Sequence, residues 1–119
     1  MKSSVMAAMS VSGIAVLIAS VASGFVGWMA WALALNGFMG QQRAVDTSMA
    51  VYIVLAVVSA FFAVLLCVLA VYFLSAKRGW NAAGSSALSV TVFAAATFAL
   101  HFASVIISAV VAGQMRTNQ

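Results

Sequence analysis

The chain has 119 residues, of which 66% are hydrophobic and only 5% are charged. A soluble globular domain carries about 25% charged residues, so the composition excludes both a water-soluble monomer and a disordered chain. The formal net charge is +4, but the lysines and arginines are scattered rather than clustered, so we expect no nucleic-acid binding. These numbers predict an integral membrane protein that forms one domain, residues 1–119, in a lipid bilayer.

Three charge-free apolar runs divide the chain, at residues 5–35, 49–75 and 87–113. Each run is longer than the roughly 20 helical residues that cross a hydrocarbon core. The chain contains no proline to kink a helix and no polar–apolar alternation typical of barrel strands. We therefore predict an all-α integral membrane protein whose three long transmembrane helices pack as a small antiparallel bundle. The predicted helices lie at about 5–36, 48–76 and 86–113, with loops at about 37–47 and 77–85.

The first apolar run leaves two alternatives open. Ser23–Gly24 could form a turn that splits the run and gives four spans, although two spans and a turn need roughly 40 residues. Lys2, the apolar stretch after it and the small residues before Ser23 also have the features of a secretory signal. Because the apolar residues continue to Leu35, we favour one long membrane-spanning helix.

Residues between the runs predict where the helices begin and end. Asn36–Gly37 can close the first helix in a left-handed conformation, since both residue types tolerate it. Asp46–Ser48 supplies side-chain oxygens that can cap the second helix, and Ser85–Ser86 can cap the third. Lys77–Arg78 suits the negative end of the second helix dipole, and Gly79 follows as a stop.

Positive charges give an expected orientation in the membrane. With three spans, Lys2, Lys77 and Arg78 share one side, whereas Arg43 and Arg116 share the other. Lysine and arginine are enriched in cytoplasmic loops. We therefore expect a multi-pass protein with its N-terminus and loop 77–85 in the cytoplasm and its C-terminus outside.

Aromatic residues give a second estimate of how the helices sit in the bilayer. Tyr52 and Tyr72 are 20 positions apart, which is about 30 Å along a helix and matches the thickness of the hydrocarbon core. Tryptophan and tyrosine are enriched at membrane–water interfaces. We therefore expect both tyrosines to be interfacial anchors, together with Trp28, Trp31 and Trp80.

Small residues recur on the first two predicted helices at spacings that let helix backbones approach closely. Helices in lipid associate through such contact, because lipid provides little hydrophobic drive between them. We predict packing faces formed by Ala15, Ala19, Ser23 and Gly27 on the first helix, beside Ser20 and Gly24, and by Ala56, Ala60, Ala63, Cys67 and Ala70 on the second. Bulky residues elsewhere on the second helix are expected to face lipid or a partner: Phe61, Phe62, Leu65, Leu66 and Leu69.

The third apolar run carries the only histidine, His101, near its midpoint. A histidine at the bilayer midplane is costly to bury, which makes it a candidate for contact with a haem or quinone, or for passing protons. The alternative is that neutral His101 forms hydrogen bonds across a helix interface. The histidine belongs to a polar stripe that we expect to face protein or a polar cavity rather than lipid: Thr97, His101, Ser104 and Ser108.

The sequence offers little material for catalysis. Asp46 is the only carboxylate side chain, and there is no Ser–His–Asp set and no glycine-rich phosphate loop. One histidine, one cysteine and dispersed methionines predict no metal site. We therefore expect a protein that is not an enzyme and requires no cofactor, although lipids are expected ligands.

Three functions are compatible with these features. The favoured one is a non-catalytic accessory subunit that stabilises or assembles a larger membrane complex, such as a respiratory, photosynthetic or ion-pumping assembly, by helix–helix packing. Its partners would be larger membrane-protein subunits or copies of itself. The second is a homo-oligomeric channel, small transporter or holin-like pore lined by the polar stripe. The third is a haem- or quinone-anchoring subunit that uses His101.

Overall fold

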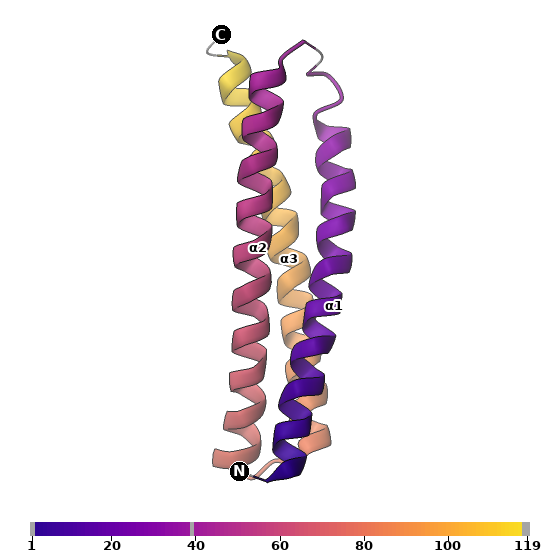
Figure 1. Ribbon diagram of the computed structural model, residues 1–119, viewed down its shortest axis with the longest axis vertical. Helices are drawn as coiled ribbons and strands as arrows, with labels where there is room; N and C mark the ends of the chain where they lie inside the picture. Colours follow the sequence, from indigo (N-terminus) through magenta and orange to yellow (C-terminus); the bar gives the residue numbers. More distant parts are fainter. Residues whose placement is uncertain (1, 39, 118–119) are drawn as a thin grey trace.

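The computed structural model describes residues 2–38 and 40–117, and over these ranges the chain is largely helical, with no strand (Figure 1). Helix α1 spans Ser3–Ala34, α2 spans Gln42–Tyr72 and α3 spans Ala82–Thr117, with a short π-helix, η1, at Phe73–Lys77. Three stretches are long and apolar enough to cross a membrane, and η1 continues the second of them. The predicted all-α bundle of three transmembrane helices is therefore confirmed. Because α1 is one continuous helix, the first run is not split into two spans.

Consecutive helices run antiparallel, so α1 and α3 point in the same direction, and α3 packs against both α1 and α2 (Figure 1). The start of α1 and the connection between η1 and α3 lie at one end of the bundle, and the end of α3 lies at the other. The bundle is 58 Å long and 19 by 16 Å across. Its length exceeds the roughly 40–45 Å of a bilayer with its headgroups, so the helices tilt or extend beyond the membrane.

Both later helices begin earlier in the chain than the hydropathy pattern predicts. In α2 residues 42–47, four of them polar, form the first turns of the helix, and Asp46 accepts a hydrogen bond from the Gln42 amide one turn earlier, at 2.7 Å, rather than capping the helix. In α3 the cap is Asn81, whose Oδ1 accepts the Gly84 N–H at 2.6 Å. The predicted caps at Ser48 and Ser85 therefore lie inside the helices.

Of the ends of α1 and η1, only the end of η1 has the predicted conformation. After η1, Gly79 adopts a φ of 74°, and the Trp80 N–H bonds the Leu74 carbonyl at 2.9 Å, so glycine ends this helix as expected. The prediction that Asn36–Gly37 closes α1 in a left-handed conformation is wrong. Among the described residues, positive φ occurs only at Gly40 and Gly79, and α1 ends through bonds from the Leu35 N–H to carbonyls in its last turn.

Small and polar residues fill the interior of the bundle, whereas bulky apolar residues cover its outside. The buried polar residues of the described ranges are Ser12, Ser20, Ser48, Ser85, Ser89, Thr97, His101, Ser104 and Ser108. The bulky α2 residues expected to face lipid or a partner are all exposed: Phe61, Phe62, Leu65, Leu66 and Leu69. This is the distribution that lipid favours, because apolar side chains are stable outside and polar groups find partners inside.

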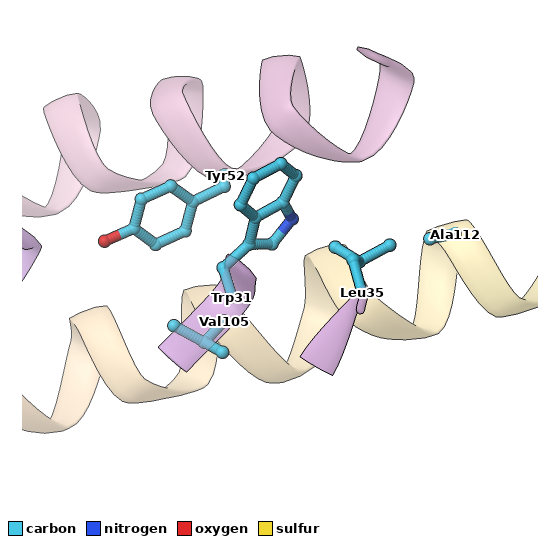
Figure 2. Packing of buried hydrophobic residues seen from close by; sticks show 5 residues of the cluster. All are labelled: Trp31, Leu35, Tyr52, Val105 and Ala112. Atoms are coloured by element: carbon cyan, nitrogen blue, oxygen red, sulfur yellow. The ribbon is translucent and has the colours of Figure 1, made fainter. Parts of the chain in front are cut away.

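The interior also contains two clusters of buried apolar residues. The larger joins all three helices and contains Trp31, Leu35, Tyr52, Val105 and Ala112, whose side chains converge in Figure 2. The smaller contains Val16, Ala63 and Cys67. Together with the buried hydroxyls, these clusters fix how each helix is rotated about its own axis.

Candidate functional site

His101 lies in the interior of the bundle, with 3% of its surface exposed. Its side chain folds back along α3, as helical side chains do, and places Nδ1 2.7 Å from the Thr97 carbonyl oxygen. A carbonyl oxygen can only accept, so Nδ1 donates its proton to the Thr97 carbonyl. Nε2 lies 3.5 Å from the Ser20 hydroxyl of α1, at the long limit for a hydrogen bond.

The imidazole of His101 packs directly against the backbone of α1 at Gly24. A Cβ atom added to Gly24 would lie 3.3 Å from Cδ2 and 3.4 Å from Nε2 of the ring. Glycine therefore permits the close approach of α1 to α3 at this level. A haem iron or a quinone oxygen could reach Nε2 only if α1 moved away from the ring, so the packing gives no support to cofactor binding at His101.

The polar stripe of α3 faces protein along its whole length. Thr97, His101, Ser104 and Ser108 are all buried. The Ser104 hydroxyl donates to the Leu100 carbonyl, and the Ser108 hydroxyl donates to the Ser104 carbonyl, both at 2.8 Å. These bonds satisfy the hydroxyl protons within α3, which is the usual state of serine in a membrane helix.

A second polar arrangement links all three helices at a single serine of α2. Trp31 Nε1 of α1 donates to Ser48 Oγ at 2.7 Å, and Ser48 Oγ donates to the Ser108 carbonyl of α3 at 2.7 Å. All of these groups are buried, so no water replaces a lost partner. We call this set of three residues the Ser48 node. It was not predicted, because Ser48 was assigned to a helix cap.

The hydroxyl of Tyr52 makes a further contact between helices. It donates from α2 to the Gly24 carbonyl of α1 and lies beside Gly27. A Cβ atom at Gly27 would lie only 2.6 Å from this hydroxyl oxygen and 3.3 Å from Val105 of α3. Gly27, like Gly24 one turn earlier, is thus a position at which α1 closely approaches both other helices.

Two of the five predicted interfacial anchors are inside the bundle. Trp31 and Tyr52 are each 4% exposed, and their polar atoms bond to neighbouring helices instead of to lipid headgroups. Because Tyr52 is buried, the spacing between Tyr52 and Tyr72 does not measure the distance between two interfacial anchors. Trp28 and Trp80 are 44% and 46% exposed and Tyr72 is half-buried, so these three have outward-facing surface.

The predicted packing faces of α1 and α2 contain both buried and half-buried residues. Buried are Ser20, Gly27, Ala63 and Cys67, and half-buried are Ala15, Ala19, Ser23, Gly24, Ala56, Ala60 and Ala70. The most buried row of α1 is that of Ser20, which it shares with Ser12 and Val16 and which lies one position away from the row of Ala15 and Ala19. Serine recurring at positions 12 and 20 was the sequence signal that could have revealed this face.

The end of the bundle near the connection from η1 to α3 carries further buried hydroxyls that were not predicted. Ser12 and Ser86 share a hydrogen bond between α1 and α3. The Ser75 hydroxyl donates to Ser85 at 2.8 Å, and Ser85 donates to the Asn81 carbonyl at 2.9 Å. Interhelical or turn-spanning hydroxyl bonds thus occur at both ends of the bundle and at its centre.

No protein-family model, no curated protein and no solved structure matches this chain. Within residues 2–38 and 40–117, no three His, Cys, Asp or Glu side chains come together as a metal site would require. The fold and the interior define a three-span helical membrane protein whose buried polar side chains mostly form hydrogen bonds within the bundle, whereas Ser89 Oγ of α3 is buried without a partner.

Proposed function

We propose that the chain is a non-catalytic accessory subunit that stabilises or assembles a larger integral membrane complex by helix–helix packing. The observation that carries the proposal is the contrast between an interior in which most polar side chains form hydrogen bonds and an apolar outside that carries a groove. Thr97, His101, Ser104 and Ser108 of α3 all form hydrogen bonds inside the bundle. We therefore assign the function to the apolar outer surface.

The hollow is a groove of about 490 Å³ between α1 and α2, lined almost entirely by apolar atoms. Its lining residues are Leu17 of α1 and Val57, Ala60, Phe61, Val64, Leu65 and Val68 of α2. Ala60 is the smallest residue of the lining, and bulky neighbours stand on either side of it. Such a shape suits the side chains of one transmembrane helix of a partner subunit, because membrane helices associate through close-fitting apolar surfaces.

The two other functions receive less support from the geometry. A pathway along the polar stripe would require α3 to separate from α1, because Thr97 and Ser108 are fully buried in the packed bundle. Binding of haem or quinone at His101 would require the same separation. Neither a cofactor nor catalytic chemistry is part of the proposed role, and the partners are a lipid bilayer and larger membrane subunits.

The proposed orientation places the N-terminus and the connection between η1 and α3 in the cytoplasm. That end of the bundle carries Lys2, Lys77 and Arg78, whereas Arg43 and Arg116 at the other end are accompanied by Asp46. The excess of positive charge at the first end supports the assignment.

A matched pair of variants tests the subunit role. We expect the chain, extracted in a gentle detergent, to migrate on a native gel in a complex that contains other chains in a fixed ratio. Ala60→Phe fills the groove and should reduce the fraction of chain in that complex at least about tenfold, a loss of about 1.4 kcal/mol in binding. Ala103→Phe adds the same side chain to the exposed face of α3 and should leave the complex intact.

Two outcomes would contradict the proposal. One is recovery of this chain alone as a closed ring with a water-filled centre, which would favour the channel function. The other is an equal effect of Ala60→Phe and Ala103→Phe, which would show that the groove has no special part in assembly.

A further inference from the structure

A second hollow lies away from the groove, at the end of the bundle where α1 and α3 begin. It has a volume of about 930 Å³, within the range of roughly 300–1,000 Å³ typical of ligand sites. Its polar and aromatic lining residues are Lys2, Ser4, Tyr72, Ser75, Trp80 and Asn81. Val5 and Ala76 add apolar surface, so the cavity is amphipathic.

Electric charge around this cavity has one sign. Lys2 lines it, and Lys77, the last residue of η1, and Arg78 directly precede its lining residues Gly79 and Trp80. The Arg78 guanidinium lies 5.8 Å from the centroid of the Phe73 ring. The only carboxylate side chain of the sequence, Asp46, lies near the start of α2, at the opposite end of the bundle. Lys2 therefore has no acidic side chain beside it, which favours an anionic ligand.

The helix backbone makes a smaller contribution to this potential. Both α1 and α3 begin at this end, with 32 and 36 residues, whereas α2 and η1 end here, so two positive ends of helix dipoles and one negative end point toward it. No side chain caps α1, and Lys2 contributes only its carbonyl to the first turn. The positive balance of the three helix ends adds to the attraction that Lys2 already provides for an anion.

The surroundings of the cavity are those of a membrane interface. Trp80 is 46% exposed and Tyr72 is half-buried, and both carry a polar atom on an apolar ring, as residues at the headgroup level do. Hydroxyl and amide groups from Ser4, Ser75 and Asn81 accompany the charge. From this combination we propose that the cavity binds the phosphate-bearing headgroup of an anionic phospholipid, with the glycerol and upper acyl chains on the apolar lining.

Retention of lipid by the purified full chain tests this inference, which does not depend on the subunit role. Native mass spectrometry would compare phosphatidylglycerol with phosphatidylcholine at equal concentration in detergent. We expect preferential retention of phosphatidylglycerol, reduced about fivefold by Lys2→Gln, since each cation near the lipid surface contributes a factor of that order. Lys2→Arg should retain the preference, and Trp80→Leu should reduce retention of both lipids.

The control replaces the cations at the other end of the bundle. The variant Arg43→Gln with Arg116→Gln lowers the net charge by two and should leave the preference unchanged. Equal retention of both lipids by the unmodified chain would overturn the inference, as would a loss in the control variant equal to that in Lys2→Gln. Release of phosphatidylglycerol by millimolar inorganic phosphate would overturn the assignment to lipid and identify free phosphate as the ligand.

Discussion

Replacing Gly27 by alanine is expected to destabilise the bundle by about 1–3 kcal/mol, the usual range for overpacking a tight interior. The added Cβ would lie 2.6 Å from the Tyr52 hydroxyl oxygen, which is the closest approach for any glycine of α1. Either the tyrosine must give up its bond to the Gly24 carbonyl or α1 must move away from α2. The measurement is the free energy of unfolding by titration with a denaturing detergent in mixed micelles.

A double-mutant cycle assigns this cost to its physical cause. Tyr52→Phe removes the oxygen that the new methyl group would meet, so Gly27→Ala should cost less in that background than alone. Gly113→Ala is the matched control, because a Cβ at Gly113 meets nothing within 4 Å and alanine favours the helix by up to about 1 kcal/mol. An undiminished cost in the Tyr52→Phe background would show that the clash is not the cause.

The second large effect is expected at the Ser48 node. Truncation of Trp31 to alanine removes the largest side chain of the interior, together with the donor to Ser48, and similar truncations cost about 3–5 kcal/mol in soluble proteins. Trp31→Phe removes the N–H group and also shrinks the buried ring. It should cost more than the about 0.6–1.7 kcal/mol of a hydrogen bond between membrane helices, but less than Trp31→Ala. The same detergent titration measures both variants.

Comparison with Trp28 and Ser48 tests the position of Trp31 in the interior. Trp28→Ala changes an outward-facing side chain and should cost far less than Trp31→Ala. Trp31→Phe and Ser48→Ala should be non-additive, because either one breaks the same bond. Strictly additive costs, or a larger loss at Trp28 than at Trp31, would place the indole of Trp31 outside the bundle.

The difference between these two tryptophans shows how far the sequence could predict the structure. Three charge-free runs were enough to establish three helices, because the bilayer sets the length of apolar stretch required. Each helix is apolar almost evenly around its circumference, so hydropathy could not show which side of α1 or α2 faces inward. Trp31 and Tyr52 were therefore assigned to the interface, although their polar atoms find partners inside the protein.

On α3 polar residues mark the inward face, because polar residues avoid lipid. Thr97, His101, Ser104 and Ser108 lie on one side of the helix, and that side is buried. The partners of these residues could not be predicted, since they depend on the rotation and height of the other two helices. Ser48 illustrates this limit, because the charges at Arg43 and Asp46 suggested a loop where α2 had already begun.

Cysteine accessibility along α3 tests most directly whether its polar face closes the bundle or lines a pathway. In a Cys67→Ala background, intact membranes that contain Ser104→Cys or Ser108→Cys would be treated with a water-soluble maleimide. Asn81→Cys is the reactive control. We expect both interior positions to remain unmodified until the bundle is unfolded, because the parent side chains are buried against other helices. Rapid modification of either position in the folded protein would contradict a closed bundle and would favour a water-filled pathway.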